Sequence, residues 1–387
     1  MKLHRISSFL KRRINQFLGA GPWRSAPFCE IASCRLDTHV RGVHRAEDFT
    51  GIVVREDEPP FAYHAGHPLF GQVKSFELLE DGRRYRDSGL ICPFPKILLS
   101  LCDAGVAADD GVVYCPRTRR AVRETLRSWT EPGETHRLLG ALRLPGATPL
   151  PGLTLNLCTL SGSGYYHFLV ESLPKLWLGR GLLSQVDHFL ANGSASGLYG
   201  RWLERAGVPM NKVIWQEPLS HYRCEQLLFS GPLMSDQGIT PWGVDAIRSL
   251  LDPPKPKNPH RRIWVSRRDA KLRRIKWEDE LLARLDGFER VELANLDPAN
   301  QIQILAEARV VAGPHGAGFS GLPFCQPGGC AIEIFPPNCM MPIYQRIAQA
   351  SGLGYYWAQL DFEGAPDIGR LANAIIAAAD STGQAEP

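Results

Sequence analysis

Short apolar runs alternate with stretches of helical spacing along the last third of the chain. The runs are brief and rich in β-branched and aromatic residues, which predicts strands at 263–265, 291–293, 309–312, 331–335 and 355–360. Between them, apolar residues recur three or four positions apart, which predicts helices near 277–285, 297–308, 343–351 and 368–379. Regular alternation of this kind predicts a parallel sheet with helices on both faces.

The middle of the chain alternates less regularly, but in the same sense. Apolar runs predict strands at 153–157, 213–215 and 226–229, and residues 167–178 have helical spacing. Residues 252–260 hold four prolines in nine positions, which favours an extended linker over a helix or a central strand. We therefore expect an α/β fold made of two units, with the linker between them and a poorly assigned extension at residues 1–90.

Composition sets broad limits on the function. The chain has 387 residues, 44% hydrophobic and 22% charged, which is typical of a globular protein with two domains. A formal net charge of +4 is too small an excess to indicate a nucleic-acid partner. The ten cysteines include no Cys-x-x-Cys pair and no zinc-type spacing, which is typical of reduced thiols in a cytosolic protein.

The first 18 residues combine basic side chains with apolar residues at helical spacing. They hold no apolar run long enough for a signal peptide or a membrane span. A basic amphipathic helix can lie on an anionic membrane surface. The alternatives are that the segment packs on the protein's own surface or is disordered. We expect a cytoplasmic protein, with peripheral contact at the inner membrane face as one of these outcomes.

A small-residue loop follows the predicted strand at 309–312. It reads His315-Gly316-Ala317-Gly318, and glycines let a ligand approach the backbone closely. A strand that ends in such a loop and restarts as a helix directs several N–H groups at one point, which suits a phosphate. Residues 316–321 also match the dinucleotide pattern G-x-G-x-x-G, but Pro323 cuts the next helix short. A serine hydrolase is disfavoured because neither 161–165 nor 318–322 completes a nucleophile elbow.

Other polar residues lie at the predicted carboxyl ends of strands, where open parallel sheets bind ligands. Ser266 and Arg267 follow the first strand of the last third, and Arg267 and Arg274 occupy the strand–helix loop. Arginines there can make forked hydrogen bonds to a diphosphate, and a solvated basic surface is the alternative. Glu333 interrupts an apolar strand, so its carboxylate needs a partner, either a sugar or ribose hydroxyl or a buried arginine.

His167 and Glu171 are four residues apart on a predicted helix and share one face. A carboxylate beside an imidazole fixes its tautomer and makes it a better general base. A structural hydrogen bond at the start of the helix is the alternative explanation of this pair.

Taken in order, these motifs resemble glycosyltransferase family 61. The resemblance covers roughly residues 150–360, and its residues are Tyr165, Tyr166, His167, Phe168, Glu171, Pro174, Ser266, Arg267, Arg273, Arg274, Ile275, Glu278, Gln301, Ile302, His315, Gly316, Ala317, Gly318, Pro327, Gly328, Glu333 and Pro336. Among its members, a bacterial capsule-type protein is the expected match. The chain departs from the family, which often has Asn, at Gly164, Trp277 and Gly321.

The resemblance implies a GT-B-like fold, with two Rossmann-like domains whose parallel sheets face a cleft. Residues 91–251 would form the acceptor-side domain, 261–365 the Rossmann-like domain that holds the nucleotide-sugar donor, and 366–387 a closing helix and tail. It also implies transfer with inversion at the anomeric carbon, without a metal or other cofactor. The acceptor would be a hydroxyl of a glycan or a lipid-linked molecule, in surface polysaccharide synthesis.

Roles for the site residues follow from the resemblance as expectations. His167, oriented by Glu171, would be the catalytic base, and His315 is the rival candidate for a chemical role. The donor and its diphosphate would be held by Ser266, Arg267, Arg274, Glu278, His315, Gly316, Ala317, Gly318 and Glu333. The alternatives are a non-catalytic subunit that binds a nucleotide sugar and an NAD-dependent oxidoreductase.

Overall fold

The computed structural model describes residues 24–26, 50–64, 66–70, 78–80, 83–85, 90–91, 93, 95–117, 120–122, 125–126, 144–194, 197–217, 219–234, 238–337, 339–364 and 366–381. The chain divides into two compact units, Met1–Asp57 with Phe94–Leu233, and Glu58–Pro93 with Met234–Pro387. The basic segment 1–18 lies outside the described residues. No helix within the described ranges is long and apolar enough to span a membrane.

The second unit contains a six-stranded parallel sheet. Its order is β16 (Phe288–Val291), β15 (Arg261–Val265), β17 (Ala308–Pro314), β18 (Cys330–Phe335), β19 (Gly354–Gln359) and β4 (His67–Pro68). The chain runs from β15 outward to β16 and then crosses back to β17 on the other side of β15. Loops after β15 and β17 therefore diverge at the carboxyl edge, which is the position where open parallel sheets bind ligands.

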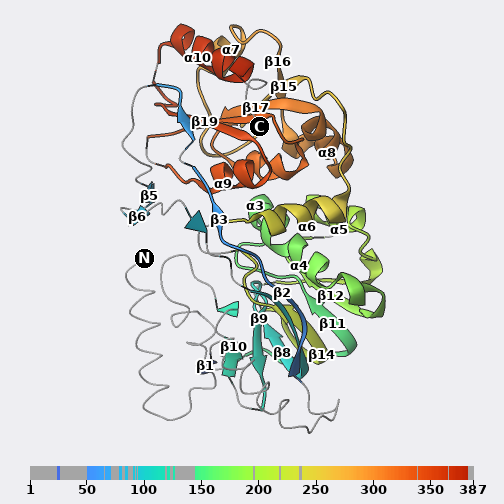
Figure 1. Ribbon diagram of the computed structural model, residues 1–387. Helices are drawn as coiled ribbons and strands as arrows, with labels where there is room; N and C mark the ends of the chain where they lie inside the picture. Colours follow the sequence, from blue (N-terminus) through green and yellow to red (C-terminus); the bar gives the residue numbers. More distant parts are fainter. Residues whose placement is uncertain are drawn as a thin grey trace, which may run out of the picture. The chain divides into compact units, whose positions relative to one another are not determined.

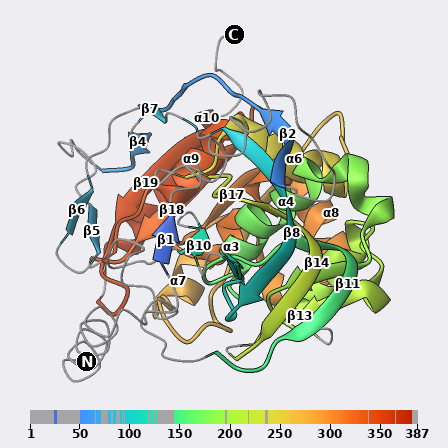
Figure 2. The same cartoon turned by 90° about the horizontal axis from the view of Figure 1, so that it is seen from below.

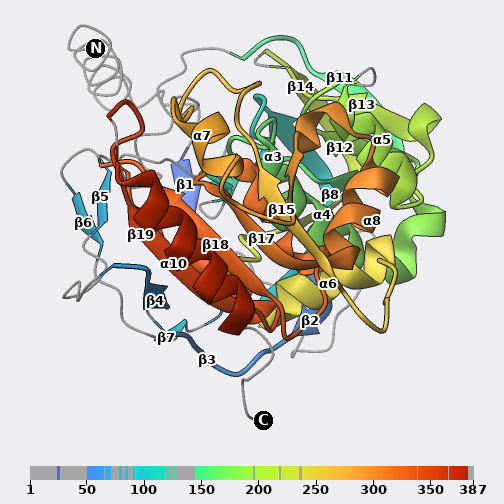
Figure 3. The same ribbon diagram turned by 90° about the horizontal axis from the view of Figure 1, so that it is seen from above.

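Helices cover both faces of this sheet (Figure 1). The helices α7 (Glu278–Leu282) and α10 (Ile368–Ser381) pack on one face, where Trp264, Val310 and Ile332 form a buried core with them. Figure 3 shows α10 running along β18 and β19. The opposite face carries α8 (Pro298–Glu307) and α9 (Ile343–Ala350). The start of α8 was predicted correctly: Asp297 caps it by accepting a hydrogen bond from Asn300 N at 2.9 Å, and Pro298 occupies the first turn.

Successive side chains of a strand point to opposite faces of the sheet, and this alternation decides which side chains of β18 and β19 face α9. Because Ile332 and Ile334 of β18 enter the core under α10, Glu333 between them faces the opposite side. By the same alternation, Tyr355 of β19 shares the face of Glu333, and Tyr356 faces α10, where its hydroxyl lies 2.7 Å from Ser381 Oγ. Strand alternation therefore places Glu333 and Tyr355 on one face of the sheet and Tyr356 on the other.

A segment from the N-terminal part of the chain completes the sheet of the second unit. The short strand β4 pairs in parallel with β19, and Leu69 N donates to Trp357 O at 2.8 Å. His64 N donates to Gln349 Oε1 at 2.8 Å, and Gln349 Nε2 donates back to His64 O at 2.7 Å. These backbone contacts make residues 58–70 part of the second unit.

The first unit contains a larger, mixed sheet. Its parallel part has the order β14 (His221–Ser230), β11 (Thr148–Asn156), β12 (His188–Ala191) and β13 (Val213–Trp215). The long strand β8 (Lys96–Ala107) lies beside β14 and is antiparallel to it, as Figure 2 shows. Beyond β8 come β9 (Val112–Cys115), β10 (Arg120–Val122) and β1 (Arg24–Ala26), and β2 (Thr50–Glu56) also pairs with β8.

A continuous helical segment follows β11 and holds the predicted acid–base pair. It comprises α3 (Tyr165–His167), a π-helical turn η4 (Phe168–Ser172) and α4 (Leu173–Leu178). The prediction of a helix over 167–178 is therefore confirmed, with a π turn inside it. Such turns are rare and occur frequently at functional sites.

The remaining differences from the sequence-based predictions are local. The strand expected at 291–293 is observed as β16 (Phe288–Val291), and residues Leu293–Asn295 form a 3₁₀ turn, η7. The contact-based division between the units falls at Leu233/Met234, so α6 (Pro241–Leu251) packs in the second unit, ahead of the proline-rich residues 252–260. An α/β fold with parallel sheets is confirmed, although the first sheet is mixed rather than wholly parallel. The GT-B-like arrangement remains a prediction.

Candidate active site

One candidate site lies in the first unit, at the carboxyl end of β11. The loop after this strand leads directly into α3, and His167 is the last residue of that helix. His167 Nδ1 lies 2.8 Å from Glu171 Oε1, and the side-chain exposures are 17% and 5%. Since a carboxylate can only accept, a neutral imidazole here donates from Nδ1 and carries its lone pair on Nε2. The predicted His167–Glu171 pair is therefore present in a geometry that suits a general base.

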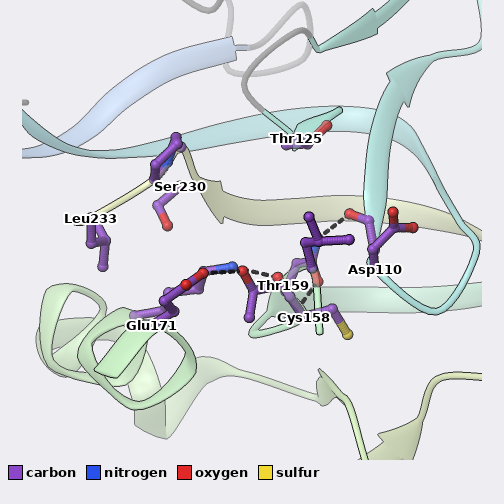
Figure 4. A pocket seen from close by; sticks show the side chains of 13 residues that line it. Asp110, Thr125, Cys158, Thr159, Glu171, Ser230 and Leu233 are labelled. Carbon is purple, nitrogen blue, oxygen red and sulfur yellow. Dashed lines mark hydrogen bonds between the residues drawn. The ribbon is translucent and has the colours of Figure 1, made fainter. Parts of the chain in front are cut away.

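Glu171 is held from a second direction. Thr159, in the loop after β11, donates its hydroxyl to Glu171 Oε2 at 2.6 Å, as Figure 4 shows. Thr159 is itself fixed, because its backbone N–H donates to Asn192 Oδ1 at 2.9 Å just beyond the end of β12. The result is a hydroxyl–carboxylate–imidazole chain that leads from the buried loop to the partly exposed ring of His167.

A small cavity lies beside Glu171. It has a volume of about 20 Å³ and its lining includes Asp110, Thr159, Glu171, Lys175 and Ser230. That is the space of one water molecule, since a water needs about 10–15 Å³ by this measure. A sugar ring does not fit this cavity, so the cavity is not an acceptor site.

Thr159, Asn192 and Lys175 were not identified from the sequence. Lys175 lies four residues after Glu171, is 7% exposed, and donates to the carbonyl of Cys158 in the same loop. The available signal was positional: Thr159 and Asn192 follow parallel strands at their carboxyl ends. Finding this signal would have required predicting the strand β12, which the apolar pattern along the sequence did not reveal.

A separate candidate site lies in the second unit, at the carboxyl ends of β15 and β17. Close approach of these ends depends on glycine: a Cβ on Gly313 would lie 2.6 Å from the carbonyl oxygen of Val265. After Gly316 the chain forms a 3₁₀ helix, η8 (Ala317–Phe324), which contains Pro323. The expected strand–loop–helix sequence is present, with a 3₁₀ helix in place of an α-helix. This short helix differs from the long α-helix that normally follows a dinucleotide-binding loop.

Arg267 lies directly against the glycine loop. A Cβ on Gly316 would lie 1.9 Å from Arg267 Nη1, so the guanidinium occupies the space beside this glycine. Its Nη2 donates to Leu272 O at 3.2 Å, and its buried Nε has no hydrogen-bond partner among the described residues. Burial lowers the pKa of Arg267. Tyr344 raises this pKa, whereas the nearby charge of Arg273 lowers it further. A buried, incompletely paired cation at a strand end is suited to binding an anion.

His315 is fully buried beside Arg267's loop and forms a second imidazole–carboxylate pair. Its Nδ1 hydrogen-bonds to Glu333 Oε1, and Tyr355 donates its hydroxyl to Glu333 Oε2. Burial lowers the pKa of His315, but Glu333 and Cys339 together raise it by more, so that the net pKa is raised. Its Nε2 has no nitrogen or oxygen partner within the described part of the chain. His315 is 0% exposed, so it places a favoured positive charge beside the glycine loop without reaching solvent.

Glu333 has partners other than those suggested by the sequence. A donor hydroxyl or a buried arginine was expected, whereas both carboxylate oxygens are engaged by His315 and Tyr355. Its 0% exposure gives a third partner no access from solvent. These contacts favour a role in holding His315 over one in binding donor hydroxyls.

The other predicted donor-binding residues have different surroundings. Ser266 donates to Glu278 Oε2 at 2.9 Å, and Trp264 Nε1 donates to Glu278 Oε1 at 2.7 Å, so this buried group ties the loop after β15 to the start of α7. Arg274 is exposed and donates to Ala270 O. Arg273 is the basic residue close enough to Arg267 and Tyr344 to lower their pKa values. The structure therefore brings together Arg267, His315 and the glycine loop, and not Arg274.

No cluster of three or more His, Cys, Asp and Glu side chains able to hold a metal ion occurs within the described ranges.

Substitutions at two glycines distinguish a role in ligand binding from a role in the stability of the fold. Gly316→Ala is expected to displace the mobile end of Arg267 and weaken nucleoside diphosphate binding, with a small change in stability. Gly313→Ala places a methyl group against the backbone of β15 and is expected to cost about 1–3 kcal/mol of unfolding free energy. Urea unfolding and calorimetric titration measure the two effects. Equal destabilisation by both variants, or unchanged binding in Gly316→Ala, would contradict this assignment.

Comparisons with known proteins bear on the same segment. Residues 165–332 match the family model described as Glycosyltransferase 61. The EGF domain-specific O-linked N-acetylglucosamine transferase of Drosophila melanogaster is 33% identical over 124 residues. That alignment covers 30% of this chain and 23% of the relative, so the chain matches less than a quarter of that protein. The matches support glycosyltransferase family 61. The matched range contains His167, Arg267 and His315, and Glu333 lies one residue beyond it.

Proposed function

We propose, building on the family-61 match, that this protein is a glycosyltransferase that moves a sugar from a nucleotide-sugar donor to an acceptor hydroxyl, with inversion at the anomeric carbon. The observation that carries the proposal is the placement of Arg267 against Gly316 at the switch point between β15 and β17. The His167–Glu171 pair supplies the base that such a transfer needs.

On the donor side, charge is the deciding property. The diphosphate leaves with negative charge, and Arg267 offers a half-buried cation whose Nε lacks a partner among the described residues. His315 adds a buried imidazole whose positive charge is favoured, and η8 begins in the same loop. Donors arranged before the reaction stabilise charge that develops in the transition state. We propose that these groups, without a metal ion, neutralise the leaving diphosphate.

On the acceptor side, His167 is the proposed general base. Its Nε2 takes the proton from the acceptor hydroxyl as the oxygen forms a bond to the anomeric carbon. The bond between that carbon and the diphosphate oxygen breaks at the same time, and its electron pair leaves with the diphosphate. Glu171 keeps Nδ1 as the donor nitrogen, and Thr159 keeps Glu171 in place. A positioned base of this kind contributes roughly 10²–10⁴-fold to rate.

The acceptor is proposed on chemical grounds only. A hydroxyl of a glycan or lipid-linked molecule in surface polysaccharide synthesis is our working choice. The relative named above carries the words EGF domain-specific in its name, so a protein hydroxyl is a second class of acceptor to test.

A thermal-shift screen against nucleotide sugars, nucleoside diphosphates and NAD tests the proposal. A ligand at about 100 times its Kd adds about 2.7 kcal/mol to the free energy of unfolding, which is readily measured. We expect stabilisation by one family of nucleotide sugars and by its nucleoside diphosphate, followed by donor turnover. Stabilisation by NAD alone would refute the proposal, and tight binding without hydrolysis or transfer would favour a non-catalytic subunit.

A further inference from the structure

Tyr355 lies outside the segment matched by the family model and was not singled out from the sequence. We propose that Tyr355 is a positioning residue for His315: its hydroxyl holds the Glu333 carboxylate, which in turn keeps the buried His315 charged beside the glycine loop that would bind the leaving diphosphate. This inference rests on the proposed function for its purpose, whereas the hydroxyl–carboxylate–imidazole chain itself can be measured independently.

The chain is built across two neighbouring strands. Ala331 of β18 pairs with Tyr355 of β19, so Tyr355 and Glu333 lie two positions apart on the same face of the sheet. Tyr355 donates to one carboxylate oxygen and His315 Nδ1 engages the other. Exposed fractions are 0% for His315, 0% for Glu333 and 2% for Tyr355, so no solvent molecule replaces either contact.

Burial makes the Tyr355 hydrogen bond important. A carboxylate removed from water is costly to keep ionised unless donors replace its hydration. Burial raises the pKa of Tyr355 well above its ordinary value, and Glu333 raises it further, so the phenol remains a hydrogen-bond donor throughout the working pH range. Removing this donor therefore disfavours the charged Glu333–His315 pair relative to the neutral pair.

The other groups near His315 come from α9, from β18, from the loop before α9 and from the loop after β15. Tyr344 of α9 and Phe335 of β18 each have a ring centroid 5.1 Å from the imidazole, and burial raises the pKa of Tyr344. Cys339, in the loop before α9, raises the pKa of His315, as Glu333 does. Arg267 lies against the adjacent Gly316. Glu333 is the acidic residue of this set, so the charge of His315 depends mainly on how well that carboxylate is held.

The N-terminal segment fixes the ring of Tyr355. Gly66 has φ +73°, and a Cβ on it would lie 2.5 Å from Tyr355 Cδ1 and 2.9 Å from Tyr355 O. The backbone of Gly66 thus packs against Tyr355, and glycine is the residue that permits this contact. The positioning chain runs from Gly66 through Tyr355 and Glu333 to His315.

Tyr355→Phe tests the inference, with Tyr356→Phe as its matched control. Tyr356 is the adjacent residue on the same strand, and its hydroxyl contacts Ser381 on the opposite face. The histidines are isotopically labelled, the His315 signal is assigned with His315→Gln, and its titration is followed by NMR. Affinities for UDP and GDP are measured by calorimetry at pH 6 and pH 8.

In Tyr355→Phe we expect His315 to lose its proton at a lower pH than in wild type, and the nucleoside diphosphate to bind about tenfold more weakly. Tyr356→Phe should match wild type in both measurements. An unchanged His315 titration in Tyr355→Phe would overturn the inference. If wild type binds neither UDP nor GDP, the proposed function fails, while the NMR titration still decides the role of Tyr355. Should Tyr355→Phe not fold, Gly66→Ala displaces the same ring, and an unchanged titration in that variant would also overturn the inference.

Discussion

Replacing His167 by Ala is expected to lower turnover by about a hundredfold or more while leaving the Kd for the nucleoside diphosphate unchanged. The imidazole is removed from the acceptor side, and its partner Glu171 keeps its hydrogen bond from Thr159. Loss of rate without loss of donor affinity identifies an interaction made in the transition state. Single-turnover kinetics with the donor found in the screen, together with calorimetric titration of UDP or GDP, give the two quantities.

His260→Ala is a suitable control for this experiment. His260 is exposed, and its Nδ1 lies 3.4 Å from Asn258 O. It should retain wild-type turnover. Wild-type turnover in His167→Ala would remove His167 from the mechanism, and the His167–Glu171 pair would then be the structural hydrogen bond considered as the alternative.

Arg267→Ala is expected to weaken nucleoside diphosphate binding by roughly 10- to 100-fold. A hydrogen bond to a charged group is worth about 1.5–3 kcal/mol, and Arg267 can contribute such a bond from a half-buried position beside Gly316. Among the described residues the guanidinium hydrogen-bonds to Leu272 O alone, so its removal should change stability little. Calorimetry and urea unfolding check both parts of the expectation.

Arg274→Ala provides the comparison, because the sequence placed Arg267 and Arg274 in the same role. Arg274 is exposed and its side chain is bound to Ala270 O, so the affinity of this variant should stay within about threefold of wild type. Equal losses in the two variants would indicate a diffuse basic surface in place of a defined site. An unchanged affinity in Arg267→Ala would refute the diphosphate assignment.

Most of the sheet of the second unit could be predicted, because β15, β17, β18 and β19 each contain an apolar run that a helical segment follows in the chain. The sequence also placed His167 beside Glu171, since a helix brings residues four apart together. The partners of Glu333 could not be predicted in this way, because Tyr355 reaches it through pairing of two strands. The antiparallel strands of the first unit were missed for a related reason: β8 pairs with β14 more than a hundred positions later.

Arg267 and Arg274 illustrate what a local sequence pattern cannot predict. Both lie in one loop, and only the fold decides which guanidinium turns toward Gly316 and which toward solvent. Glu333 shows the complementary limit: a lone acid in an apolar strand correctly indicated a buried carboxylate with a partner, but the pattern did not identify that partner.

The pairing of β4 with β19 has a consequence for biosynthesis. Residues 67–68 leave the ribosome long before residues 356–357, with which they pair. The nascent chain must therefore keep this stretch accessible while nearly three hundred further residues are translated, and the second unit gains its outermost strand only after β19 has been made. A gene fragment that starts at the proline-rich stretch encodes a sheet without that strand, and Tyr355 without the glycine that packs against its ring.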